Sequence, residues 1–358
     1  MKSKITYHEQ TDIENTLKLR EVLKTLPSFA SEFFRGISTT TSTSTRIKYA
    51  YDLRIFFQYL QKENPELAKI PMDQMSIDVL DQVTALDIEE YTEYLKAYVG
   101  SQESYTTNGE KGLKRKLSAL RTFYSYYFKK ELIETNPTLL VDMPKLHEKE
   151  IIRLEPDEVA ELLDFIESCG DSLGNHQRAY YEKTKERDFA IITLLLGTGI
   201  RVSECVGLDL EDVDFKNNGI KVLRKGGNEM VIYFGEEVAE ALKKYIEIRA
   251  GITPVAGHEH ALFYSVQRKR MNVKSVENLV KKYASHVTTT KKITPHKLRS
   301  TYGTTLYQET GDIYLVADVL GHKDVNTTKK HYAAMDDARR RQAATAVRLR
   351  ESIPDHDK

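Results

Sequence analysis

The chain has 358 residues, with 53 Lys+Arg against 53 Asp+Glu and 40% hydrophobic residues. This length is typical of about two domains, and the hydrophobic share excludes a chain that is disordered throughout. No apolar run approaches the roughly 20 residues that a bilayer-spanning helix needs. The first residues lack the apolar core of a signal peptide, and two cysteines are too few for a disulfide framework or a zinc site. We therefore expect a cytoplasmic protein with no membrane partner.

The zero net charge is unevenly distributed. Lys111–Lys130 holds seven basic residues and no acidic one, and Arg268–Arg299 holds ten basic residues and one acidic residue. Pro71–Leu95, by contrast, carries seven acidic residues and no basic one. Because exposed charges are screened beyond about 8–10 Å at physiological salt, a phosphate backbone would respond to these local runs. Solvated helix faces explain such runs equally well.

The first 150 residues read almost entirely as helix. Apolar residues at helical spacing predict helices over Ile13–Phe34 with a break at Pro27, Arg46–Gln61, Ile77–Val83, Ile88–Tyr98 and Glu110–Leu132. The Ser/Thr-rich stretch Ser38–Thr45 would supply an N-cap to the second of these. Asn136-Pro137 ends the region, and residues 143–152 are predicted to form a linker.

The pattern after the linker combines helices with one hairpin. Alternating residues in Gly219–Leu223 and Glu229–Phe234 flank a glycine turn and predict a β-hairpin. The predicted helices are Glu155–Ser168, Tyr180–Leu196 (buried after Arg187), Glu236–Arg249, Val273–His286, Pro295–Thr310, Ile313–Leu320, Thr327–Met335 and the basic Asp336–Arg350. We therefore expect a mainly α protein with a small β-hairpin, made of a helical domain over 1–142 and a mixed α/β domain over 153–358.

Four short segments concentrate cationic and proton-transferring side chains. Their candidate residues are Arg201, Lys225, His296, Arg299, His322 and Tyr332. The chain has no Walker loop, no metal-ligand spacing and no GxSxG elbow. Guanidinium groups bind phosphate oxygens and stabilise developing charge, and a tyrosine hydroxyl can act as a nucleophile. This set suits phosphodiester chemistry without a metal ion, although each residue taken alone is more often a surface, capping or core residue.

The order and spacing of these segments resemble the tyrosine recombinases, the phage integrase family. The family signature is an Arg, a hairpin Lys, H-x-x-R, L-G-H and a Tyr nine or ten residues later. The pattern Y-x-x-D-L-x-x-F from Tyr49 to Phe56 also resembles the helix that opens the family's core-binding domain, and Leu117–Tyr124 resembles its end. The resemblance implies a helical (SAM-like) DNA-binding domain over 1–142. It implies a catalytic domain over 153–358 with a C-terminal helix exchanged between protomers.

The resemblance also implies a role for each candidate. Tyr332 would attack the scissile phosphate, leaving a 3′-phosphotyrosyl link and a free 5′-hydroxyl. Arg201 and Arg299 would hold the non-bridging oxygens, His296 would act as acid and base for the tyrosine proton, and His322 would donate a hydrogen bond to the phosphate. Because the covalent link conserves the bond energy, no cofactor is implied.

The hairpin departs from the family pattern. Lys225 would protonate the leaving 5′ oxygen, but the family's G-K-G is replaced here by Arg224-Lys225-Gly226-Gly227, and Arg224 and Lys221 remain alternatives. Glu204 matches an acidic residue that would orient the arginine and the histidine.

The implied partner is a double-stranded DNA recombination site, bound as a clamp by a dimer and synapsed as a tetramer, with a Holliday junction between exchanges. Candidate DNA-binding residues in the basic runs are Lys114, Arg115, Arg121, Arg268, Lys269 and Arg270. Within the family, the chain resembles stand-alone Xer-type enzymes of Gram-positive cocci, which resolve chromosome dimers with a DNA translocase. An integrase or resolvase of a mobile element fits the same chemistry. A type IB topoisomerase and a non-catalytic DNA-binding factor are the remaining alternatives.

Overall fold

The computed structural model describes residues 6–99, 105–147, 151–172, 174–224, 227–322, 324–325 and 328. The chain divides into two compact units, Met1–Lys149 (unit 1) and Glu150–Lys358 (unit 2). The division falls inside residues 143–152, where a linker is predicted. Over the described ranges, no helix is long and apolar enough to cross a membrane.

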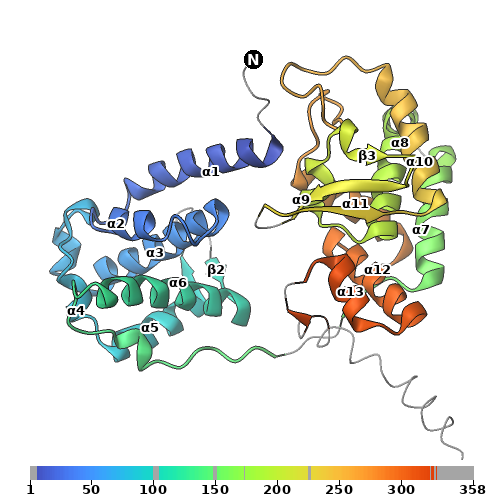
Figure 1. The fold of residues 1–358 in the computed structure, drawn as a ribbon. Helices are drawn as coiled ribbons and strands as arrows, with labels where there is room; N and C mark the ends of the chain where they lie inside the picture. The colour runs from blue at the N-terminus through green and yellow to red at the C-terminus, as the bar shows by residue number, and fades with distance from the viewer. Residues whose placement is uncertain are drawn as a thin grey trace, which may run out of the picture. The chain divides into compact units, whose positions relative to one another are not determined.

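Unit 1 is a bundle of helices with one small hairpin (Figure 1). Its helices are α1 (Tyr7–Leu23), α2 (Ala30–Gly36), α3 (Thr43–Glu63), α4 (Val79–Gln82), α5 (Ala85–Lys96) and α6 (Glu110–Lys129), with short 3₁₀ turns at Leu67–Lys69, Met72–Gln74 and Pro137–Leu139. Helices α3 and α6 pack together, and their aromatic side chains fill the centre of the unit. Phe56, Phe57, Phe123, Tyr124 and Tyr127 are each at most 1% exposed.

Local side-chain chemistry sets several of the helix ends in unit 1. Ser42 caps α3 through a hydrogen bond from the backbone N–H of Thr45, as the Ser/Thr-rich stretch predicts. The predicted helix Ile88–Tyr98 is wrong at its end, because Tyr98 lies in strand β1 (Ala97–Val99), which pairs with β2 (Tyr105–Thr107). The side-chain amide of Asn108 donates a hydrogen bond to the carbonyl of Leu95, near the end of α5, at 2.7 Å. The chain therefore turns into a hairpin that the periodicity does not predict.

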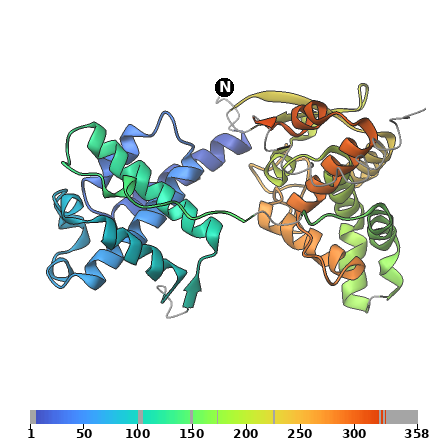
Figure 2. The same cartoon turned by 90° about the horizontal axis from the view of Figure 1, so that it is seen from below.

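Unit 2 consists of helices packed around α8 (Asn175–Thr198) and of a three-stranded antiparallel sheet. Its other helices are α7 (Pro156–Ser168), α9 (Val202–Gly207), α10 (Glu236–Ala250), α11 (Val273–Val287), α12 (Pro295–Thr310) and α13 (Ile313–Leu320), with 3₁₀ turns at Cys169–Ser172 and Leu210–Asp212. The strands are β3 (Val213–Asp214), β4 (Gly219–Leu223) and β5 (Glu229–Tyr233), in the order β3-β4-β5. Figure 2 shows the hairpin β4–β5 on the same side of unit 2 as α13.

Helix α8 is the central element of unit 2. Residues 187–195 are all buried, as the apolar run predicts, and the helix packs against α7, α10 and α12. It ends at Gly199, whose φ of 61° is favourable for glycine. A side chain at Gly199 would also overlap the Tyr302 ring. This tight turn delivers the chain directly to Arg201.

The mainly α fold class with a small sheet is confirmed. Helices α12 and α13 have the predicted bounds, whereas α9 and the strands β1, β2 and β3 were not predicted. The predicted helix Thr327–Met335 lies outside the described residues except for residue 328. The predicted C-terminal helix Asp336–Arg350 lies entirely outside them.

Candidate active site

Three guanidinium groups meet at the C-terminal end of helix α13. The carbonyl groups of residues 319–321, which we call the α13 terminus, accept hydrogen bonds from Arg201, Arg224 and Arg299. The last carbonyls of a helix have no intrahelical partner and carry partial negative charge. The α13 terminus is therefore a suitable anchor for cations that come from three different segments of the chain.

Arg299 is buried in this cluster. Its side chain, on α12, is only 4% exposed and donates to the carbonyls of Gly199, at 2.6 Å, and of Leu320. It thus joins the end of α8 to the end of α13. His296 lies three residues earlier in the first turn of the same helix and is exposed. The spacing that predicts a shared helix face therefore gives a buried guanidinium and an accessible imidazole.

Arg201 is held by Glu204 as well as by the α13 terminus. Glu204 accepts from the backbone N–H of Arg201 at 2.7 Å and from its Nη1 at 2.8 Å. Nη2 of Arg201 donates to the carbonyl of Gly321 at 3.2 Å. The Glu204 side chain is 3% exposed, whereas the Arg201 side chain is 34% exposed. One buried carboxylate therefore caps α9 and holds a guanidinium that still reaches solvent, and the orienting role of Glu204 toward the arginine and the histidine stays a prediction.

Arg224 is the third arginine at the α13 terminus. Its Nη1 donates to the carbonyl of Leu320 at 2.5 Å and its Nη2 to that of Val319 at 2.6 Å. Burial lowers the pKa of this guanidinium, and the charge of Arg201 lowers it further, while Glu204 opposes the shift. A side chain so engaged has its end groups turned into the protein. Its geometry is that of an anchor, which weakens the case for Arg224 as the proton donor of the hairpin.

The other alternative, Lys221, lies on β4 with an exposed side chain. Its Nζ contacts Glu229 on β5 at 3.4 Å. Lys225 and Tyr332 are outside the described residues, so both assignments remain predictions.

His322 follows directly after the α13 terminus. Its backbone N–H donates to the carbonyl of Ala317 at 2.9 Å, which closes the turn around Gly321. Its ring Nδ1 lies 2.7 Å from the hydroxyl of Thr328, which is fully buried. This contact fixes the plane of the imidazole. No motif in the sequence points to Thr328, because its role depends on the way the chain returns after His322.

Gly321 is a position where glycine is required. Its φ is 61° and its ψ 49°, in the left-handed region that ends many helices. A Cβ at this position would overlap the guanidinium of Arg224. The glycine of L-G-H therefore both terminates α13 and makes room for a cation at its end.

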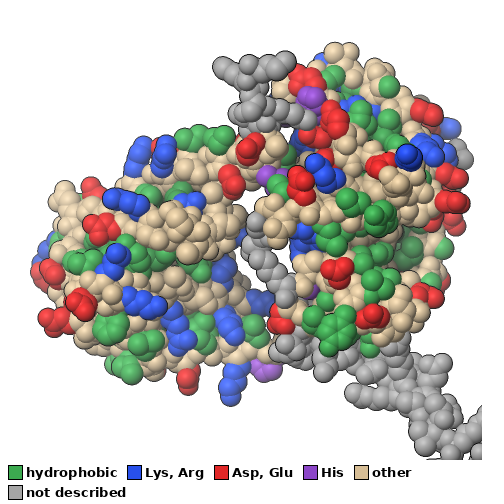
Figure 3. All heavy atoms as spheres, in the orientation of Figure 1, with side chains coloured by type: hydrophobic (Ala, Val, Ile, Leu, Met, Phe, Trp, Pro, Cys, Tyr) green, Lys and Arg blue, Asp and Glu red, His purple; other side chains and the backbone are tan. Residues whose placement is uncertain are grey.

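The predicted DNA-binding residues of α6 have different environments. Arg115, with a 43% exposed side chain, is paired with the buried Asp52. Arg121 donates to the carbonyls of Thr138, at 3.1 Å, and Val141, so it ties α6 to the following turn. Lys114 is half-buried. Figure 3 shows basic side chains on the lower part of unit 1, where α6 runs, so this surface remains the predicted contact of unit 1 with DNA.

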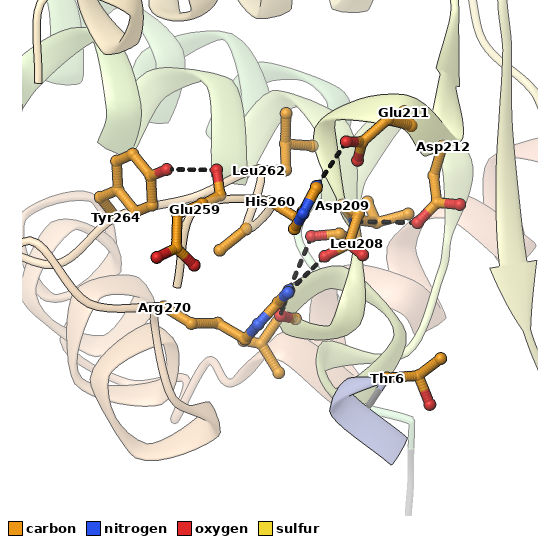
Figure 4. Close-up of polar contacts among 12 residues, drawn as sticks. Thr6, Leu208, Asp209, Glu211, Asp212, Glu259, His260, Leu262, Tyr264 and Arg270 are labelled. Atoms are coloured by element: carbon orange, nitrogen blue, oxygen red, sulfur yellow. Dashed lines mark hydrogen bonds and ion pairs between the residues drawn. The ribbon is translucent and has the colours of Figure 1, made fainter. Parts of the chain in front are cut away.

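The second predicted DNA-binding group is divided in the same way. Arg268 and Lys269 are exposed. Arg270 instead points inward, where it pairs with Asp209 and donates to the carbonyl of Leu208 at 2.8 Å (Figure 4). Its side chain is 13% exposed. These contacts give Arg270 a structural role, and a count of charges along the sequence cannot distinguish it from its two exposed neighbours.

The arrangement as a whole suits an anionic substrate with a phosphorus centre. Two of its arginines, Arg201 and Arg299, belong to the predicted set, and the third, Arg224, carries the hairpin into the same cluster. Rigid guanidinium groups bind phosphate oxygens and stabilise charge that develops in a transition state. Such a cluster of cations is suited to phosphodiester chemistry.

Comparison with known proteins identifies the family. Residues 152–339 match the phage integrase family model, and the chain belongs to this family, the tyrosine recombinases. It is 36% identical over 337 residues to tyrosine recombinase XerC of Caldanaerobacter subterraneus subsp. tengcongensis, covering 91% of this chain and 88% of the relative. It is 30% identical over 346 residues to tyrosine recombinase XerS of Streptococcus uberis, covering 89% and 95%.

A solved structure shares the fold over nearly the whole chain. The XerH site-specific recombinase bound to a palindromic difH substrate has a TM-score of 0.66 and 19% identity, covering 96% of this chain and 90% of that one. The family match and the Xer relatives confirm the predicted family, the predicted enzyme class and the predicted function in site-specific recombination.

Proposed function

We propose that this enzyme recombines duplex DNA at a specific site through a 3′-phosphotyrosyl intermediate on Tyr332, and that its task is the Xer-type resolution of chromosome dimers. The observation that carries the proposed chemistry is the convergence of Arg201 and Arg299 on the α13 terminus, next to His322. The extent of the Xer relatives, which match this chain along most of their own length, supports the biological task.

The proposed cleavage step exchanges one phosphorus–oxygen bond for another. The Tyr332 oxygen bonds to phosphorus, and the bond from phosphorus to the 5′ oxygen breaks. The phenolic proton passes to His296, and the leaving 5′ oxygen takes a proton from the Lys225 ammonium group. The reverse reaction, with a 5′-hydroxyl from another strand, rejoins the DNA and frees the tyrosine. No net redox change or hydrolysis occurs.

The arginines act on the charge of the phosphorane in this scheme. Arg201 is partly exposed and so can reach a non-bridging oxygen. Arg299 holds two carbonyls in the structure and would turn part of its donor set toward the phosphate when DNA is bound. His322, oriented by Thr328, would supply a further hydrogen bond. Each such donor contributes about 10²–10³ in rate when it is preorganised.

Both units are proposed to contact the duplex. Unit 1 would serve as the core-binding domain, and the exposed Lys269 and Arg268 of unit 2 would contact phosphates. The DNA-bound state of XerH supports duplex DNA as the partner. A dimer on each site and a tetramer in the synapse, exchanging the segment 336–350, complete the proposal, together with a DNA translocase that activates the assembly in the cytoplasm.

A covalent-adduct assay tests this function. The binding site is first footprinted on DNA from the source genome, and a nicked half-site is synthesised from it, so that the cleaved end diffuses away. Wild-type enzyme is expected to form an SDS-stable adduct, and Tyr332→Phe is expected to form none. Tyr314→Phe is the matched control, because Tyr314 lies on α13 with a 71% exposed side chain and no predicted role.

The outcomes separate the alternatives. An adduct with Tyr332→Phe, or no adduct with wild type, would contradict the assignment of Tyr332 as the nucleophile. A footprint at a mobile-element end, in place of a single chromosomal site, would contradict the Xer task while leaving the chemistry intact.

A further inference from the structure

The side chain of Arg224 connects two parts of the site that are distant in sequence. Arg224 follows strand β4, and its backbone closes the turn of the hairpin. Its N–H donates to the carbonyl of Asn228 at 2.8 Å, and its carbonyl accepts from Gly227 at 3.1 Å. The side chain leaves the hairpin and binds the carbonyls of Val319 and Leu320 in the α13 terminus. The turn is therefore fixed both by its own backbone and by helix α13.

The side chain of Arg224 is buried with one of its donors unpaired among the described residues. The residue is 8% exposed, and its Nε has no hydrogen-bond partner among the described residues. A buried charge that is incompletely paired is destabilising, and Arg201 nearby has the same charge. Stability alone therefore gives a weak reason for an arginine at this position.

One acceptor is shared between Arg224 and the predicted phosphate clamp. The carbonyl of Leu320 accepts from Nη1 of Arg224 and also from Nη2 of Arg299. Arg224 is therefore tied to the same carbonyl as Arg299, and Lys225 is the next residue in the sequence. The hairpin and the clamp thus have a common reference point at the end of α13.

We propose that Arg224 is a positioning residue for proton donation by Lys225: by fixing the hairpin turn to the α13 terminus, it places the lysine at the leaving 5′ oxygen of the phosphate that the other arginines hold. The inference rests on the proposed function, in which Lys225 is the proton donor. Arg224 does not touch the substrate in this account. Its contribution is to fix the position of Lys225.

The test exploits the need of the leaving group for a proton. Two half-sites are compared, one with the natural 5′-bridging oxygen and one with sulfur in that place. A thiol has a pKa of about 8.5, so the sulfur leaves as a thiolate without a proton donor. Single-turnover cleavage by excess enzyme is measured for Lys225→Ala, Arg224→Met and Arg224→Lys on both substrates.

Loss of a general acid costs about 10²–10⁴ in rate, so Lys225→Ala is expected to fall by that factor on the oxygen substrate. Arg224→Met misplaces the donor and is expected to fall about 10–100-fold. Arg224→Lys, which keeps one charged donor for the carbonyls, is expected to lie between Arg224→Met and wild type. On the sulfur substrate, all three variants are expected to cleave within about threefold of wild type, since the acid step is bypassed.

Arg249→Met is the matched control. Arg249 is also 8% exposed and also binds backbone carbonyls, those of Glu259, Ala261 and Leu262, but within the described ranges no hydrogen bond joins it to a predicted site residue. Its loss is expected to lower the unfolding temperature while leaving the oxygen-to-sulfur rate ratio at the wild-type value. Gel-shift affinity for the uncleaved site reports whether each variant is folded.

The results distinguish the two proposals. If the sulfur substrate restores the cleavage rate of Lys225→Ala but not that of Arg224→Met, Arg224 acts by a general structural effect and the inference is wrong. The inference is also wrong if Arg224→Met cleaves the oxygen substrate at the wild-type rate. If Lys225→Ala itself fails to recover, Lys225 is not the proton donor and the proposed function must be revised first. If no Arg224 variant folds, Arg224 is structural and the inference is overturned.

Discussion

Replacement of Glu204 by glutamine separates the stabilising role of this carboxylate from its role in the active site. The carboxylate accepts the backbone N–H of Arg201 as a helix cap and also binds its guanidinium. A lost cap costs about 1 kcal/mol, and an ion pair to a partly exposed arginine contributes about 1 kcal/mol or less. Glutamine keeps the shape and one acceptor oxygen, so we expect Glu204→Gln to lower the free energy of unfolding by about 1–2 kcal/mol.

The same substitution is expected to slow cleavage by more than the stability loss explains. Arg201 keeps its contact with the carbonyl of Gly321 but loses the carboxylate charge and one of the two acceptor oxygens of residue 204, so its guanidinium is less well oriented. The rate should fall about 10–100-fold, below the full 10²–10³ of a deleted donor. Single-turnover cleavage of the nicked half-site at saturating enzyme measures this rate, and thermal unfolding measures stability, with an expected shift of about 2–8 °C for a unit of this size.

Glu158→Gln is the control for this experiment. Glu158 has the same local position, the third residue of a helix whose capping box it completes in α7, and it pairs with Lys291 at 2.5 Å. Its loss should cost similar stability and leave cleavage unchanged. A Glu204→Gln enzyme that cleaves within threefold of wild type, or a Glu158→Gln enzyme that is slowed as much, would refute the reasoning.

Three further predictions follow from burial and contacts. Arg270→Ala should lower the free energy of unfolding by about 2–3 kcal/mol, measured by urea unfolding, because its ion pair and carbonyl hydrogen bonds are lost. Lys269→Ala should leave stability unchanged and reduce the slope of log K for DNA binding against log salt concentration by about one. If the two variants had equal effects in both experiments, the distinction between a structural Arg270 and a DNA-contacting Lys269 would be contradicted. Gly321→Ala should destabilise by about 1–3 kcal/mol, because it strains a positive φ and displaces Arg224, and wild-type stability in urea unfolding would contradict this account of the turn. Burial raises the pKa of the Cys205 thiol to about 12, so the thiol stays protonated at pH 8 and should be alkylated by iodoacetamide only after unfolding. Rapid labelling of the native enzyme would contradict the burial of Cys205.

The sequence predicts some parts of the fold well because their signals are local. Helix α12 begins at Pro295 and ends before Gly311, which has a positive φ, and both residues are ordinary boundary signals. The hairpin β1–β2 has no such signal, since its strands have three residues each and its Tyr105 is exposed. Short exposed strands lack the hydrophobic alternation on which prediction depends.

The site was predictable to the extent that its residues form short motifs. The order of Arg201, His296 and Arg299 indicated the family, but their meeting point at the end of α13 arises only from the packing of distant segments. The same limit applies to the charged runs. Arg121 and Arg270 belong to runs that suggest DNA contacts, yet both bind backbone carbonyls. A sequence gives the charge of a side chain, whereas its partner is decided by tertiary structure.

The central claim is that DNA becomes covalently attached to Tyr332 through its 3′-phosphate. The most direct measurement is mass spectrometry of the trapped adduct after protease and nuclease digestion. The account predicts a single modified peptide, with a nucleotide 3′-phosphate on Tyr332 and a free 5′-hydroxyl on the released strand. A nucleotide on any other residue, or a 5′-phosphate linkage, would contradict it.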